Sequence, residues 1–217
     1  MPEALQGQVC CYGATDLPAR AEATQAAAHA LAPALRHLWH AGAPRWVSGL
    51  QRAKQMAEAL DAAVASLPPL PCVPTAPALA PRKPLAPTRV PPLQWHTDNR
   101  LNEFNFGCWE LKPWAGIPKA AVDEWTAHFP HHPFGGAETA WQMVQRVRAA
   151  LRVTLAQLQA CGQHEALWVA HAGTARALQV LQTSPAGELG SASDWPLSAP
   201  APGSACAYVL SPDAFTH

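Results

Sequence analysis

Residues Glu165–Leu178, with the sequence EALWVAHAGTARAL, decide the fold expected for this chain. Five apolar residues, Ala166–Ala170, follow one another without alternation, which is typical of a strand buried on both faces. A small turn follows, and a helix is expected to open with Thr174 as its cap. His171 should therefore lie at the carboxyl end of a parallel strand, beside a helix amino terminus. Open α/β sheets bind ligands at this position, where free backbone N–H groups favour an anion.

Segments with helical and strand-like patterns alternate along the rest of the chain. Helices are expected over residues 19–40, 50–67, 117–129 and 138–161, and short strands over 45–48, 94–97 and 205–210, the last at a sheet edge. This alternation is typical of a three-layer α/β domain, with helices on both faces of the sheet. Residues 68–92 are rich in proline and predict an extended insertion. We expect one domain over residues 1–217 that includes this insertion.

Composition narrows the range of partners. Lys and Arg number 15, as do Asp and Glu, so the formal net charge is zero and gives no electrostatic basis for binding nucleic acid or an acidic membrane. The six cysteines form no C-x-x-C pair, which is typical of free thiols in a reducing compartment. No secretory signal and no membrane-spanning stretch is found in the sequence, so a cytoplasmic location is expected.

Five short motifs occur in a fixed order along the chain. They are CYGATDLP at 11–18, VSGLQRA at 47–53, LNEFNFGCWE at 101–110, FGGAET at 134–139 and VAHAGTAR at 169–176. In this order they resemble the motifs of the histidine phosphatase superfamily, the phosphoglycerate-mutase-like enzymes. The first and third motifs together are most similar to the branch that contains alpha-ribazole phosphatases and related small-molecule phosphatases.

The resemblance implies a three-layer α/β/α sandwich and a phosphomonoesterase that acts on a small phosphorylated metabolite without a cofactor or metal. Such enzymes transfer a phosphoryl group to a histidine and then to water. By resemblance, Arg52 and His171 hold the phosphoryl oxygens as cationic donors, which fits the charge that spreads over those oxygens in the transition state. Glu103 protonates the leaving oxygen and then takes a proton from water. Thr15 and Gly13 line the substrate entrance.

One part of the superfamily pattern is missing. Its signature, Arg-His-Gly or Arg-His-Ala at the end of the first strand, carries the nucleophilic histidine and is expected about ten residues before the 11–18 motif. Residues 1–9 contain neither arginine nor histidine, and Arg36-His37 lies within a helical run after the loop that it should precede. The resemblance therefore implies a fold without its first central strand, and a chain that is inactive as given.

Two hypotheses explain this gap, and other functions stay open. In the first hypothesis, the true start lies upstream of Met1 or the gene is truncated, and the retained Arg52, Glu103 and His171 favour this hypothesis. In the second, the chain is a non-catalytic relative that binds phosphorylated ligands or a protein partner. Within the enzyme class, a phosphoglycerate-type mutase is the alternative. A metal site is a further alternative, because His128, His131 and His132 lie close together in sequence, although they have no carboxylate or cysteine partner at a useful spacing.

Overall fold

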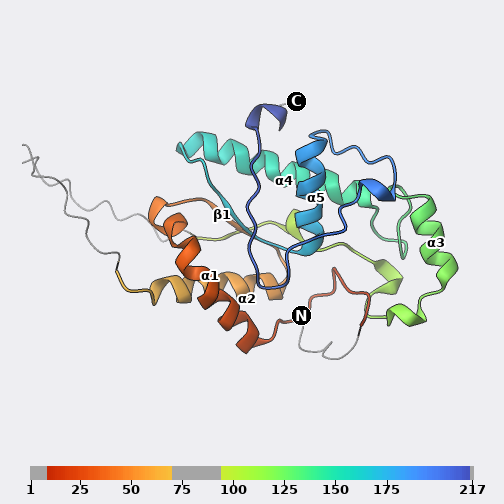
Figure 1. The fold of residues 1–217 in the computed structure, drawn as a ribbon, viewed down its shortest axis with the longest axis horizontal. Coiled ribbons are helices and arrows are strands. Elements are labelled where there is room, and N and C mark those ends of the chain that lie inside the picture. The colour runs from red at the N-terminus through yellow and green to blue at the C-terminus, as the bar shows by residue number, and fades with distance from the viewer. Residues whose placement is uncertain (1–8, 70–93, 216–217) are drawn as a thin grey trace, which may run out of the picture.

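The computed structural model describes residues 9–69 and 94–215, and Figure 1 shows their arrangement. The proline-rich insertion expected over residues 68–92 lies outside the described residues, except for its first two residues. The helices are α1 (Ala21–Ala41), α2 (Gln51–Ala65), α3 (Lys119–Ala127), α4 (Ala140–Cys161) and α5 (Ala172–Thr183), and the strands are β1 (Arg45–Val47), β2 (His96–Thr97) and β3 (Leu167–Val169). The alternation of helices and strands expected from the sequence is therefore confirmed for these elements.

The three strands form one parallel sheet in the order β2-β1-β3. Trp46 of β1 is in register with His96 on one side and with Trp168 on the other. Parallel neighbours need a long crossover between them, and α2 supplies part of the connection between β1 and β2. In the described residues, β3 pairs with β1 alone, so its other side has no strand partner there. Within residues 9–69, no strand precedes α1.

Helices cover both faces of this sheet, as Figure 1 shows, with α1 and α2 together on one face and α4 and α5 together on the other. Val47 and Val169 pack into the cluster with α1 and α2, whereas Trp46 packs with Ala150 of α4. Side chains alternate along a strand, so these neighbours in β1 serve opposite faces. The contact between α1 and α2 is built largely from buried alanines, which let the two backbones approach closely: Ala28, Ala32, Ala53, Ala57 and Ala63.

Local sequence sets where the helices begin and end. Thr139 accepts the backbone N–H of Gln142, and Gln142 accepts that of Thr139, which is a complete capping box at the start of α4. Gly42 and Gly162 end α1 and α4 in the left-handed region, with φ of 70° and 64°. Because α4 is anchored at both ends, its buried face from Val144 to Leu151 meets the sheet and α5 in a fixed register.

Three details of the sequence prediction are wrong. The strand β3 is not dry on both faces: Val169 is buried, but Leu167 and Trp168 are half-buried because a cavity borders the unpaired side of the strand. Helix α5 begins at Ala172 with His171 at the N-cap, and the Thr174 hydroxyl donates to the Leu101 carbonyl instead of capping the helix.

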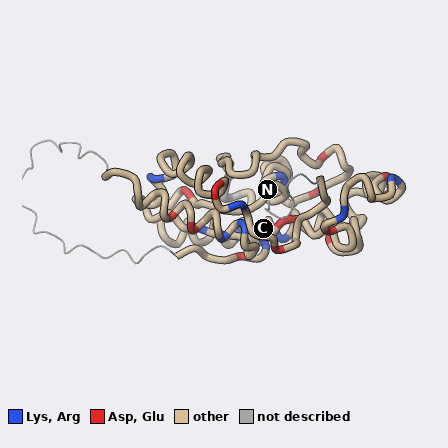
Figure 2. The backbone as a smooth tube through the Cα atoms, turned by 90° about the horizontal axis from the view of Figure 1, so that it is seen from below, with Lys and Arg blue, Asp and Glu red and all other residues tan. Residues whose placement is uncertain are grey.

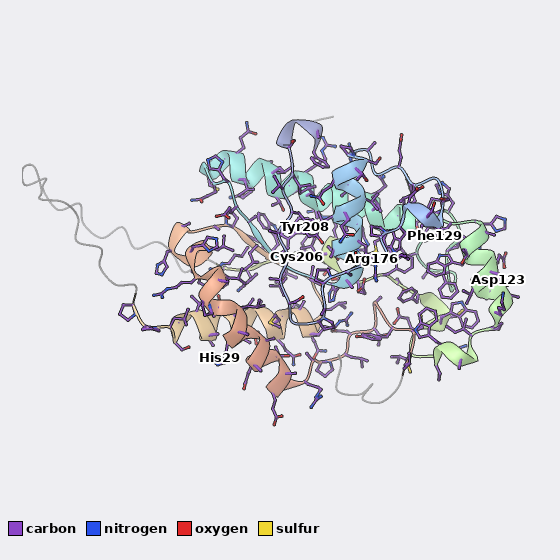
Figure 3. All side chains as sticks on the ribbon, viewed as in Figure 1. His29, Asp123, Phe129, Arg176, Cys206 and Tyr208 are labelled. Carbon is purple, nitrogen blue, oxygen red and sulfur yellow. The ribbon has the colours of Figure 1, made fainter. Side chains whose placement is uncertain are left out.

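The third error concerns residues 205–210, which form no strand. Their backbone is extended, and they lie next to α5, as the label of Tyr208 in Figure 3 shows. The Gln182 side chain donates to the Val209 carbonyl, and Gln179 donates to the Tyr208 hydroxyl. Side chains of α5 therefore hold this segment, which takes no part in the backbone pairing of the sheet.

Charged residues of both signs are interspersed over the described backbone, as Figure 2 shows, in keeping with the zero formal net charge. Within the described ranges, no helix combines the length and apolar character needed to cross a bilayer.

Candidate functional site

Glu103 lies at the amino terminus of α5, in the loop that follows the short turn Asn99–Leu101. Its Oε1 accepts the N–H of Phe104 at 2.9 Å and the N–H of Gly173 at 3.1 Å, and its Oε2 lies 3.2 Å from the same Gly173 nitrogen. The anion at this helix terminus is therefore the chain's own carboxylate. Leu101, which is fully buried, anchors the loop that carries it.

His171 belongs to a chain of hydrogen bonds whose donors can be assigned. The N–H of Gly49 donates to Asn102 Oδ1 at 2.8 Å, which fixes that oxygen as an acceptor, so the Ser48 hydroxyl must donate its single proton to it, also at 2.8 Å. His171 Nε2 lies 2.8 Å from Ser48 Oγ and must therefore be the donor of that bond. A neutral His171 ring thus carries its proton on Nε2 and a lone pair on Nδ1.

The electrostatic surroundings of His171 keep its ring neutral. Burial, and then the positive charges of Arg52 and Arg146, lower the pKa of His171 from 6.5 to about 3. The sequence analysis expected a charged donor at this position. The structure instead gives a ring that is uncharged at neutral pH.

Arg52 extends from the first turn of α2 toward the loop that contains Gly13 and Thr15. One terminal nitrogen donates to the Thr15 carbonyl at 2.8 Å, and the other donates to the Gly13 carbonyl. The guanidinium also lies 5.6 Å from the centre of the Tyr12 ring. These two bonds use two of the five N–H donors, so three remain for an anion.

The Gly13 and Thr15 loop is fixed from its other side by Glu110. This carboxylate accepts the backbone N–H groups of Gly13, Ala14, Thr15 and Phe106 and the Thr15 hydroxyl. The same hydrogen bonds lower the pKa of Glu110 against the effect of burial, so the group stays ionised. A Cβ on Gly13 would meet the Phe104 carbonyl oxygen at 1.9 Å, which explains the glycine.

Arg146 of α4 is a residue of the site that the sequence analysis missed. Its guanidinium donates to both carboxylate oxygens of Glu138 and to the backbone carbonyls of Arg100, Asn102 and Glu103. It therefore ties the Glu103 loop to α4. Three of its partners are backbone carbonyl oxygens more than 40 residues away in sequence, so no periodicity or local motif could have indicated that it holds the Glu103 loop.

One cavity of about 820 Å³ brings the three main predicted residues together. Arg52, Glu103 and His171 line it, and so does Tyr12, whereas Gly13 and Thr15 do not. Residues of α1, α2, α4 and α5, strand β3 and residues 200–208 line most of the rest, and many of their side chains are apolar. Gly13 and Thr15 thus hold Arg52 and Glu110 in the structure, and Tyr12 is the residue of their motif that reaches the cavity.

The other histidines described in the structure form neither a metal site nor a second imidazole beside His171. His37 and His164 also line the cavity, but His37 is exposed on α1 and faces Glu165 at 3.6 Å. His128 contacts the Glu124 carbonyl, and the rings of His131 and Trp141 are 6.1 Å apart. In the described ranges, no three His, Cys, Asp or Glu side chains converge as metal ligands do.

Comparisons with solved structures identify proteins of similar fold. Among solved structures, a mycobacterial hydrolase is 20% identical, with 83% of this chain and 68% of the other covered and a TM-score of 0.57. The mycobacterial glucosyl-3-phosphoglycerate phosphatase is also 20% identical, with 83% and 76% covered and a TM-score of 0.56, and its complex with inorganic phosphate matches equally well. At this level of identity the likeness is one of fold. A search of curated proteins finds no match.

A sequence model of the histidine phosphatase superfamily (branch 1) matches residues 72–188, which is more than half of the 217-residue chain. The matched part contains Glu103 and His171, and the solved structures named above have a similar fold. This chain belongs to the histidine phosphatase superfamily.

Proposed function

We propose that the chain binds the phosphoryl group of a small phosphomonoester between Arg52 and His171. The observation that carries this proposal is the convergence of Arg52, Glu103 and His171, from three separate elements, on one cavity. Arg52 keeps three N–H donors free, and a planar guanidinium suits phosphate oxygens. A phosphate dianion beside His171 would offset the charges of Arg52 and Arg146 that lower its pKa, so the ring would take up a proton as the ligand binds.

We further propose that Glu103 is the general acid at the leaving oxygen. Two backbone N–H groups hold Glu103 Oε1 and one of them also reaches Oε2, so the carboxyl group is fixed while Oε2 keeps capacity for a further hydrogen bond. A fixed acid that lies beside the phosphoryl site can protonate an alkoxide as the P–O bond breaks. This arrangement supports a phosphomonoesterase, and the alpha-ribazole phosphatase branch is the substrate class that the motifs resemble most.

Hydrolysis through a phosphohistidine needs a second imidazole at this site. In residues 9–69 and 94–215, the imidazole at this site is that of His171, which is hydrogen-bonded to Ser48. The side of β3 that no described strand pairs with borders the same cavity. A strand added along β3 would bring its carboxyl end toward Arg52 and His171. We propose that the nucleophile belongs on such a strand, and that the chain without it is a phosphomonoester-binding protein.

Calorimetric titration with inorganic phosphate tests the binding proposal. Saturable binding is expected, with a loss of at least roughly tenfold in affinity for His171→Asn and for Arg52→Lys, which keeps the charge but not the fork. Arg152→Ala, a change at an exposed residue of α4 that does not line the cavity, is the matched control and should bind normally. Equal phosphate affinity in all four proteins would reject the proposed site.

A second experiment tests the catalytic part. An apolar strand that ends in Arg-His-Ala, joined directly before Met1, should create phosphatase turnover that the unextended chain lacks. In the extended protein, Glu103→Ala should slow an alkyl phosphate far more than nitrophenyl phosphate, because only the poor leaving group needs the proton. Equal slowing of both substrates would remove Glu103 from the acid role.

A further inference from the structure

Ser48 directly follows β1 and is 0% exposed. Its backbone N–H donates to the Val169 carbonyl at 3.0 Å, so the pairing of β1 with β3 extends to this residue. The Ser48 side chain therefore stands at the carboxyl end of the sheet, where open α/β sheets bind their ligands. A hydroxyl group that is buried this completely needs partners for its proton and for its lone pairs.

The Ser48 hydroxyl uses its full hydrogen-bonding capacity. It donates its proton to Asn102 Oδ1 at 2.8 Å. It accepts the Nε2–H group of His171 at 2.8 Å and the backbone N–H of Leu50 at 3.3 Å. One donor and two lone pairs are all that a serine hydroxyl offers. The hydroxyl therefore has one orientation, in which it is an acceptor toward His171.

The three partners of this hydroxyl belong to the three elements that carry the proposed phosphoryl and acid residues. Leu50 is the N-cap of α2, whose first turn carries Arg52. Asn102 directly precedes Glu103, and His171 is the N-cap of α5. One buried side chain thus joins the elements from which Arg52, Glu103 and His171 reach the cavity of about 820 Å³.

Asn102 sets the direction of these hydrogen bonds. Its Oδ1 accepts the backbone N–H of Gly49 at 2.8 Å as well as the Ser48 proton. The reversed amide would place its own N–H group against both donors, so the observed orientation is the one that satisfies all three groups. The Asn102 backbone is held too, because its carbonyl accepts from Arg146 at 2.7 Å.

This chain of hydrogen bonds leaves one ring nitrogen of His171 for a ligand. Nε2 is held by Ser48, and among the described residues none hydrogen-bonds to Nδ1. The ring lines the cavity together with Arg52 and Glu103. The charges that lower its pKa are those of Arg52 from α2 and of Arg146 from α4, so an anion is the ligand that this part of the cavity favours.

We propose that Ser48 and Asn102 are positioning residues of the phosphoryl site, which hold the His171 ring with its proton on Nε2 so that Nδ1 meets the phosphoryl oxygens. The proposal rests on the proposed function, because it takes the Arg52–His171 site as the phosphoryl site. As the dianion binds, Nδ1 takes up one proton from solvent and donates it to a phosphoryl oxygen, while Nε2–H stays on the Ser48 hydroxyl. The two residues therefore decide which ring nitrogen gains the proton.

Nitrogen NMR of the full chain with isotope-labelled histidine tests the proposal, because it reports which ring nitrogen carries the proton. The His171 signals are assigned by their loss in His171→Asn. At neutral pH the unaltered chain should show a protonated Nε2 and an unprotonated Nδ1. Asn102→Leu removes the acceptor of the Ser48 proton, so the hydroxyl should donate to Nε2 and the ring proton should shift to Nδ1. Asn102→Asp keeps an acceptor oxygen and should keep the proton on Nε2.

Two further measurements separate positioning from a merely structural role. Saturating inorganic phosphate should protonate Nδ1 in the unaltered chain, and should change the Nδ1 signal little in Asn102→Leu, where this nitrogen already carries the proton. Ser48→Ala nearly conserves the buried volume, so it serves as a second variant that keeps the core intact. It leaves Nε2–H without its acceptor, and both proton positions should then be populated.

Asn105→Leu is the matched control, because Asn105 is an exposed asparagine of the same loop that does not line the cavity. It should keep the proton on Nε2 and respond to phosphate as the unaltered chain does. A proton that stays on Nε2 alone in Asn102→Leu or in Ser48→Ala would overturn the positioning proposal, as would bound phosphate that leaves Nδ1 unprotonated. Failure of phosphate to bind the unaltered chain, with the proton still moved to Nδ1 in Asn102→Leu, would overturn the proposed function instead.

Discussion

Both carboxylate oxygens of Glu103 lie against the backbone nitrogen of Gly173, at 3.1 and 3.2 Å. This contact joins the loop that carries the proposed acid to the amino terminus of α5, the helix that follows His171. The approach is so close that only a glycine leaves room for it, since an added Cβ would stand 2.2 Å from Glu103 Oε1 and 2.6 Å from Met143 Cε. The positions of the acid and of the helix terminus therefore depend on each other.

Gly173→Ala should destabilise the protein by about 1–3 kcal/mol, because the methyl group must displace Glu103 or Met143. Chemical denaturation measures the change. Gly116→Ala is the matched control, since a Cβ there has no neighbour within 4 Å, and it should be neutral or slightly stabilising. The double variant Glu103→Ala/Gly173→Ala should recover part of the loss, and no recovery would show that Met143 alone causes the clash.

Arg146→Met should destabilise the protein by about 2–3 kcal/mol, because it leaves Glu138 and three loop carbonyls without their charged donor. Arg146 and Glu138 are 20% and 14% exposed, so solvent screens the pair only partly. Arg152→Met, an exposed change on the same helix, should alter the free energy of unfolding by less than about 0.5 kcal/mol. Similar losses in the two variants would mean that Arg146 does not anchor the loop.

His171 should make the protein less stable as the pH falls from 6.5 toward 3. The unfolded ring has a pKa near 6.5 and the folded ring one of about 3, so the unfolded state binds the extra proton in this interval. The contribution of the neutral His171 ring to the free energy of unfolding is fully present above pH 6.5, and it declines by about 1.4 kcal/mol per pH unit below that value. In His171→Asn this part of the slope should disappear, as urea unfolding at several pH values would reveal. Parallel curves for the two proteins would contradict the buried, neutral ring.

Phosphate binding should be accompanied by proton uptake at His171. The bound dianion raises the pKa of a ring that is neutral in the free protein, so affinity should fall as the pH rises through the new pKa. Titrations at pH 6 in buffers of different ionisation enthalpy measure the protons taken up. His171→Asn should take up fewer protons than the unaltered chain, and an equal number in both would place the uptake on another group.

The sequence was sufficient to predict the helices and the three described strands, because apolar periodicity and turn residues are local signals. Arg52, Glu103 and His171, which line one cavity, could be singled out as candidates because each lies within a motif. Arg146 and Glu110 act through backbone groups far away in sequence, which leave no periodic trace. The segment 205–210 has a strand-like composition, but α5 side chains hold its backbone, so tertiary contacts decided its conformation.

The unpaired side of β3 has a consequence for how this protein behaves in concentrated solution. A strand edge that no neighbouring strand occupies is a template for any extended chain, and natural proteins usually blunt such edges with charge, proline or a covering loop. Here no strand of residues 9–69 and 94–215 pairs with this side of β3, which borders the cavity lined by residues 200–208, and the half-buried Leu167 and Trp168 belong to it. We therefore expect storage life to be set by edge-to-edge aggregation, and a short peptide that pairs with β3 to act as a solubiliser.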